Sequence, residues 1–160
     1  MNINRTYEQN MTDKHDRRTQ SLADIKALVS GRSEVLSLYA GLAEHRPYAE
    51  NKNFAEELEK FSEALIDYTA GAHFQLYRHL AESTERRKSV LEVADQSYEK
   101  IVKTTDQILE FNDRYGDCKD LDVYAGHLET DLSLLGEILA DRIQYEDQMI
   151  SALEGNRSAK

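Results

Sequence analysis

The sequence predicts an all-α protein, an up-down-up-down antiparallel four-helix bundle with long helices. The chain has 160 residues but only one proline and seven glycines, so the residues that punctuate strands and turns are rare. Four segments repeat apolar residues at spacings of three, four and seven, as a helix with one buried face does. The short connections between them, of about ten residues or fewer, favour antiparallel neighbours.

The length of the chain predicts one domain. Residues 1–20 are polar and mixed in charge, and they show no apolar periodicity. We therefore expect a flexible, frayed N-terminal tail over residues 1–20, followed by a single four-helix domain over residues 21–155.

Two helices are predicted in the first half of this domain. The first begins at Ser21 and ends near His45, because Pro47 disfavours helix in the residue before it. Asn53 caps the second helix, which continues to about residue 80. The predicted buried stripes are Leu22, Ile25, Val29, Leu36, Tyr39 and Ala43 in the first helix, and Phe54, Leu58, Phe61, Leu65, Tyr68, Ala72, Leu76 and Leu80 in the second.

Two further helices are predicted in the second half. The third ends at Gly116, since a residue without Cβ suits the left-handed position that follows a helix. The fourth carries Arg142 and Glu146, four residues apart, inside its apolar seam, so we expect a buried, paired polar network that His73 could join. The predicted stripes are Leu91, Ala94, Tyr98, Ile101, Thr105, Ile108 and Tyr115 in the third helix, and Leu121, Tyr124, Leu128, Leu132, Leu135, Leu139, Met149 and Leu153 in the fourth.

The net charge of the chain indicates which kinds of partner it can bind. Thirty acidic residues against twenty basic ones give a net charge of −10, the wrong sign for binding nucleic acid phosphates or an anionic membrane. Residues 53–82 carry six acids and two bases, and residues 119–154 carry nine acids and two bases, so the acidity is concentrated on two helices. This distribution favours a basic partner.

The sequence offers no sign of a membrane span, a secretory signal or a disulfide. The chain has no long uncharged apolar run, and its N-terminus lacks an apolar signal core. Cys118, the single cysteine, cannot form an internal disulfide. We therefore expect a cytoplasmic protein.

We expect no enzyme activity, metal or cofactor. A ferritin-like metal site needs Glu-x-x-His pairs, and none of the five histidines has a glutamate three residues before it. The acids Asp117 and Asp120 beside Cys118 would raise the pKa of its thiol, which disfavours a nucleophilic role. A bundle that holds a metal or small ligand through carboxylates and histidine stays the less favoured alternative.

A candidate docking surface lies on the polar side of the second helix. On a helical wheel Phe74 falls about 180° from the core residue Leu65. An aromatic ring facing water among small and charged residues indicates a partner-binding surface, unless the N-terminal tail covers it or it is a harmless exposed side chain. The residues grouped around Phe74 on this wheel are Glu63, Ile66, Asp67, Ala70, Gly71, Tyr77 and Arg78.

Three segments resemble the Rsd/AlgQ family of bacterial anti-sigma factors, also called regulators of sigma D. LIDYTAGAHFQLY (65–77) resembles the family's DY-x-x-AGHF-x-x-Y block, ILEFNDRYGDC (108–118) its FNDR segment, and LGEILADRIQYEDQMI (135–150) its R-x-x-x-ED helix. The likeness spans about residues 25–155. The chain departs from the family pattern at Leu28, where the family has a tryptophan.

The resemblance implies a function. Family members are four-helix proteins, not enzymes, that bind the C-terminal domain of the housekeeping sigma factor, which reads the −35 promoter element. By this resemblance Asp67 and Phe74 contact sigma, while Arg142, Glu146 and Asp147 match the charged helix. We predict a monomer that forms a 1:1 complex and sequesters sigma from core RNA polymerase and promoter DNA. A helical adaptor with the same docking face and a different protein target is the alternative.

Overall fold

The computed structural model describes residues 3–45, 54–81, 88–116 and 125–154, and in these ranges it contains helices and no strand. The helices are α1 (Ile3–Ala43), α2 (Phe54–Ala81), α3 (Lys88–Tyr115) and α4 (Ala125–Glu154). The predicted all-α class is therefore confirmed. The predicted fourth helix begins within residues 117–124, and that start lies outside the described residues.

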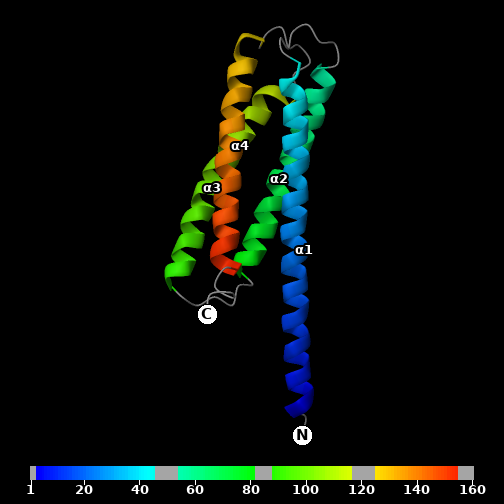
Figure 1. Cartoon of the computed structure of the whole chain (residues 1–160), viewed down its shortest axis with the longest axis vertical. Coiled ribbons are helices and arrows are strands. Elements are labelled where there is room, and N and C mark those ends of the chain that lie inside the picture. Colours follow the sequence, from blue (N-terminus) through cyan, green and yellow to red (C-terminus); the bar gives the residue numbers. More distant parts are fainter. Residues whose placement is uncertain (1–2, 46–53, 82–87, 117–124, 155–160) are drawn as a thin grey trace.

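The helices form two tightly packed pairs, α1 with α2 and α3 with α4 (Figure 1). Arg78 near the end of α2 lies 3.5 Å from Asp24 of α1, measured from Nη1 to Oδ1. Arg114 near the end of α3 lies 2.8 Å from Asp131 near the start of α4, measured from Nη1 to Oδ2. The two helices of each pair therefore run antiparallel, and an ion pair joins them.

One apolar core lies between the helices. The predicted stripe of α2 is buried at every position from Phe54 to Leu76, as is that of α4 from Leu128 to Leu139 and again at Met149 and Leu153. Phe111 of α3 joins the core through an edge-to-face contact with Phe61, with ring centroids 6.5 Å apart. The core residues contributed by α3 are Ala94, Ile101, Ile108, Phe111 and Tyr115.

The buried stripe predicted for the first helix is wrong in its register. The structure exposes Leu22, Val29 and Leu36, which are 53%, 40% and 41% exposed. The sequence has a second apolar series with the same seven-residue spacing, displaced by one position, and periodicity cannot choose between two such series. The residues that α1 buries are Leu28, Val35 and Leu42.

The segment expected to be a frayed tail is helical from Ile3 onward. Figure 1 shows this N-terminal part of α1, in blue, continuing past the ends of the other helices. A polar segment without apolar periodicity lacks a face that packs against a core, but it can still form a helix. The chain has no proline or glycine between Ile3 and Ser30 to end the helix.

Candidate functional site

The outer face of α2 carries the most exposed large apolar side chain of the described residues, Phe74, at 66%. The opposite face of the helix supplies the core through Leu65, Ala72 and Leu76. The predicted outward position of the ring is therefore confirmed. The imidazole of His73 supports the ring edgewise, with centroids 5.9 Å apart.

Phe74 belongs to a row of four exposed residues, Glu63, Asp67, Ala70 and Phe74, which we call the α2 ridge. Spacings of four, three and four residues keep the row on one face of the helix. Two carboxylates thus lie at one end of the ridge and an aromatic ring at the other, with a small residue between them. This row combines an apolar anchor with anionic hydrogen-bond acceptors.

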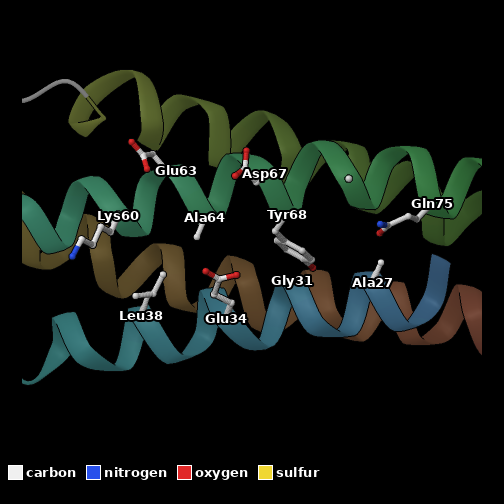
Figure 2. A pocket seen from close by; sticks show the side chains of 11 residues that line it. Ala27, Gly31, Glu34, Leu38, Lys60, Glu63, Ala64, Asp67, Tyr68 and Gln75 are labelled. Carbon is white, nitrogen blue, oxygen red and sulfur yellow. The ribbon is translucent and has the colours of Figure 1, made fainter. Parts of the chain in front are cut away.

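A groove of about 380 Å³ lies beside the ridge, between α1 and α2 (Figure 2). Its polar rim holds three acids and one base: Glu34 from α1, and Lys60, Glu63 and Asp67 from α2. Its other lining residues include the small side chains Ala27, Gly31, Ala64 and Gly71. A groove with small walls and an acidic rim suits an incoming basic side chain.

A second hollow, of about 410 Å³, lies on the other flank of the ridge, against the end of α3. Glu63 and Asp67 line both hollows, so these carboxylates are accessible from either side of α2. Ile66, predicted at the shoulder of the docking surface, is half-buried and lines this second hollow together with Asn112.

The remaining predicted docking residues differ in position. Gly71 faces the groove, where an added Cβ would meet only Gln75 Nε2, 3.7 Å away. Arg78 is exposed but pairs with Asp24 of α1, so it belongs to the α1–α2 contact as well as to the surface. The side chain of Tyr77 lies outside the described part of the structure.

The predicted polar pair on α4 is fully buried, as expected. Arg142 Nε lies 3.3 Å from Glu146 Oε2, and neither side chain is exposed. Arg142 Nη1 donates hydrogen bonds to the hydroxyls of Thr105 and Thr104 on α3, at 2.8 and 3.0 Å. These hydrogen bonds join α4 to α3.

The other helices reach the same carboxylate. Tyr68 of α2 donates its hydroxyl to Glu146, and Arg32 Nη1 of α1 lies 3.7 Å from Glu146 Oε1. Burial raises the pKa of Glu146, and the neighbouring cations and the Tyr68 hydroxyl oppose that rise. Burial also raises the pKa of Tyr68, so its hydroxyl stays a hydrogen-bond donor at neutral pH. Residues from all four helices therefore meet at one buried ion pair, with Thr104 and Thr105 of α3 on Arg142, and Tyr68 and Arg32 on Glu146.

His73 does not join this network, which corrects the sequence-based expectation. Its Nδ1 lies 2.9 Å from the hydroxyl of Tyr98 on α3, at an exposed position. Ala72 is buried, and the next residue along a helix is rotated by about 100°. The ring of His73 therefore lies outside the core, beside α3, and does not reach Glu146. Tyr68, and not His73, is the additional hydrogen-bond partner of Glu146. The sequence did not indicate this role, because a tyrosine within an apolar stripe predicts only that the ring packs in the core.

The described residues also bear on other classes of function. No group of three or more His, Cys, Asp or Glu side chains there is placed to hold a metal ion. In the same ranges no helix combines the length and the apolar character needed to cross a membrane.

In the described ranges, helices alone carry an exposed aromatic residue on an acidic ridge, which is an arrangement typical of protein-binding modules. Comparison with known proteins gives the family. A profile described as "Regulator of RNA polymerase sigma(70) subunit, Rsd/AlgQ" matches residues 8–154, so the chain belongs to the Rsd/AlgQ family. This is a family of sigma-factor regulators and not of enzymes, and the resemblance seen in the three sequence segments is confirmed.

Curated relatives agree with this assignment. The chain is 28% identical over 137 residues to the "Regulator of sigma D" of Yersinia enterocolitica, covering 84% of this chain and 79% of the relative. It is 30% identical over 132 residues to the "Regulator of sigma D" of Enterobacter sp. (strain 638), covering 80% of this chain and 79% of the relative. No solved structure matches the chain.

Proposed function

We propose that this chain is an anti-sigma factor that binds the C-terminal, −35-reading domain of the housekeeping sigma factor. It sequesters that domain from core RNA polymerase and promoter DNA, in the cytoplasm, with one sigma domain bound per chain. The observation that carries the proposal is the exposure of Phe74, at 66%, on a ridge that also holds Glu63 and Asp67.

Phe74 supplies the apolar anchor of the interface. An aromatic ring that enters a pocket of the partner and loses its water is a typical hot spot, worth 2 kcal/mol or more on truncation. Ala70 and Gly71 next to the ring carry almost no side chain, so a partner helix can approach the α2 backbone closely. An anchor with room around it suits the compact helix-turn-helix module.

The acids supply the specificity. A domain that reads DNA carries arginine and lysine side chains for phosphate contacts. Glu34, Glu63 and Asp67 around the groove offer carboxylates for charge-assisted hydrogen bonds to such side chains. Basic groups engaged by this surface are unavailable to DNA, so binding and promoter recognition exclude each other. The net charge of −10 adds long-range attraction to a cationic partner.

Calorimetric titration of the isolated sigma C-terminal domain tests the proposal. Phe74→Ala should weaken binding about 30-fold or more, the equivalent of about 2 kcal/mol, while the melting temperature stays close to that of the wild type. Leu134→Ala is the matched control, because Leu134 is also an exposed apolar side chain, at 50%, but lies on α4. Equal affinity of Phe74→Ala and wild type would refute the docking mode. Absence of binding by the wild type would refute the proposal itself.

A further inference from the structure

The α2 ridge alone offers too little surface for a stable complex. A specific interface buries about 800 Å² on each partner, whereas the ridge is one row of exposed side chains on a single helix. Hot-spot residues also lie near the centre of an interface, where a ring of neighbouring contacts excludes water from them. Phe74 in that role needs cover on both flanks of α2. The groove beside α1 supplies one flank, and the other flank lies toward α3.

Two ring contacts define how α3 lies against α2. Phe61 of α2 meets Phe111 of α3 with ring centroids 6.5 Å apart. His73 of α2 meets Tyr98 of α3 with ring centroids 6.0 Å apart. The later residue of α2 meets the earlier residue of α3, so the two helices run antiparallel in one register between these contacts.

Two exposed apolar side chains of α3 lie on this flank, Val102 and Leu109, which are 40% and 43% exposed. Val102 is one helical turn from Tyr98, whose hydroxyl lies 2.9 Å from His73 Nδ1 of α2. Leu109 follows seven residues later and shares that side of the helix. The register of the two helices sets Val102 level with Ala70 of the ridge. Val102 and Leu109, which we call the α3 row, therefore run alongside the α2 ridge.

The hollow between α2 and α3 carries negative charge. Glu59, Glu63 and Asp67 of α2 line it at intervals of four residues, and its described lining residues include no lysine, arginine or histidine. Like charges at this spacing repel one another on a helix, so a cation placed among them is stabilising. Figure 2 shows the carboxylates of Glu63 and Asp67 directed away from α1. The groove beside α1 contains Lys60, which offsets part of its negative charge, so the hollow is the better site for a cation.

A buried hydroxyl at this hollow lacks a hydrogen-bond partner. Ser62 lines the hollow and is only 3% exposed, and its Oγ makes no hydrogen bond to any described residue. A buried polar group without a partner is costly, and most such groups in folded proteins are satisfied. Asn112 of α3 adds a side-chain amide to the same hollow. Carboxylates, a hydroxyl and an amide oxygen together form a set of acceptors that suits the planar guanidinium of arginine.

We propose that the sigma-binding surface extends from the α2 ridge across this hollow to the α3 row. An arginine of the sigma domain places its guanidinium in the hollow, within hydrogen-bonding reach of Ser62 and the three acids. Apolar side chains of the same domain cover Val102 and Leu109. The inference rests on the proposed function for its occupant, and it adds α3 to the interface. The charge of the hollow and its continuity with the ridge favour the same basic domain that Phe74 anchors.

Calorimetric titration with the isolated sigma C-terminal domain tests the α3 row. Val102→Ala/Leu109→Ala should weaken binding about tenfold, and the melting temperature should stay close to that of the wild type because both side chains are exposed. Val93→Ala/Leu134→Ala is the matched control and should bind as the wild type does. It removes the same two types of exposed side chain, from α4 and from a position about 180° around α3 from Val102. Equal affinity of the two double variants would overturn the proposal.

Ser62→Ala tests the hollow by a comparison of stability with affinity. The hydroxyl has no partner among the described residues, so its removal should not lower the melting temperature of the free protein. The affinity for the sigma domain should fall about fivefold, because the complex loses a hydrogen bond to a charged group. A variant with lowered melting temperature and unchanged affinity would show that Ser62 is structural, and would overturn its assignment to the interface.

Glu59→Gln tests the charge of the hollow in the same titration. Glu59 lines the hollow and not the groove beside α1, and its replacement should weaken binding about threefold. Glu137→Gln changes the net charge of the chain equally at an exposed position on α4, and it should bind as the wild type does. Equal weakening by both variants would assign the effect to the net charge and would overturn the guanidinium site.

These experiments separate the two proposals. Weak binding by Phe74→Ala, together with wild-type affinity in the variants of the α3 row and the hollow, would overturn the extension to α3 and leave the docking mode in place. Absence of sigma binding by the wild type would overturn both.

Discussion

Tyr68 on α2 donates its hydroxyl to the buried carboxylate of Glu146 on α4. These two helices make few other contacts, since α2 packs mainly on α1 and α4 mainly on α3. The hydrogen bond therefore ties one antiparallel pair of helices to the other at the centre of the core. Arg142 completes the arrangement, because its guanidinium lies 5.4 Å from the centre of the Tyr68 ring and pairs with the same glutamate.

Removing the arginine from this network should destabilise the fold. Arg142→Met would leave Glu146 buried without its i−4 cation, at a cost of about 3 to 5 kcal/mol. The free energy of unfolding in urea measures the effect. An unchanged urea midpoint would contradict the burial of this pair.

The double variant Arg142→Met/Glu146→Met serves as the control. Replacing both charges by apolar groups of similar length removes the unpaired carboxylate, so the double variant should be more stable than Arg142→Met alone. If it were less stable, the ion pair itself, rather than the stranded charge, would dominate the energetics.

The sequence predicts most of this fold because α2 and α4 each have a single apolar stripe. Their buried residues follow one series with helical spacing. Arg142 and Glu146 stand within that series, and because an unpaired buried charge is costly, the sequence predicts that they pair. The exposed ring of Phe74 follows from the same reasoning, as the residue opposite the stripe. In these helices the local pattern and the tertiary packing agree.

Other features could not be read from the pattern. In α1 two apolar series stand one residue apart, and only the packing of α2 against the helix selects Leu28 over Val29. Polar contacts between helices depend on relative rotation and height, which one sequence does not encode locally. For that reason Tyr68 was missed as the partner of Glu146 and His73 was assigned to it wrongly.

Gly136 of α4 should not tolerate a larger side chain. An added Cβ would clash with the hydroxyl end of Tyr39, which is held by a 2.7 Å hydrogen bond to the carbonyl of Leu132. Gly136→Ala should therefore lower the free energy of unfolding by about 1 to 3 kcal/mol. Thermal or urea unfolding measures it.

Gly126 on the same helix is the matched control for this substitution. Nothing lies within 4 Å of a Cβ added there. Gly126→Ala should leave stability unchanged or raise it by up to about 1 kcal/mol through helix propensity. Similar effects of the two substitutions would show that Tyr39 does not press on α4.

Asp131 should make the stability of the protein sensitive to acid. Burial raises the pKa of its carboxyl, but hydrogen bonds from Tyr115 and Arg114 outweigh that effect and lower the pKa below 3.8. Because the folded state binds the proton less tightly than the unfolded state, Asp131 stabilises the fold above pH 3.8, and this contribution is lost as the pH falls below that value.

Urea unfolding of wild type and Asp131→Asn, at neutral pH and at several pH values below 3.8, measures this contribution. The wild type should be more stable at neutral pH, and the difference should shrink on acidification. Comparison of the two variants cancels the effect of the other carboxylates. Parallel stability curves for the two proteins would exclude a lowered pKa at Asp131.

The acids of the α2 ridge and the ring of Phe74 should affect sigma binding through different rate constants. Attraction between the net charge of −10 and a basic domain acts before contact, so it raises the association rate. The Debye length falls from about 10 Å at 0.1 M salt to about 3 Å at 1 M, and the association rate should fall with it.

Asp67→Asn should lower the association rate at low salt and flatten its salt dependence. Phe74→Ala should instead raise the dissociation rate and leave the salt dependence unchanged. Stopped-flow kinetics across a salt series measures both constants, and a salt-independent association rate in the wild type would eliminate electrostatic steering as the role of these acids.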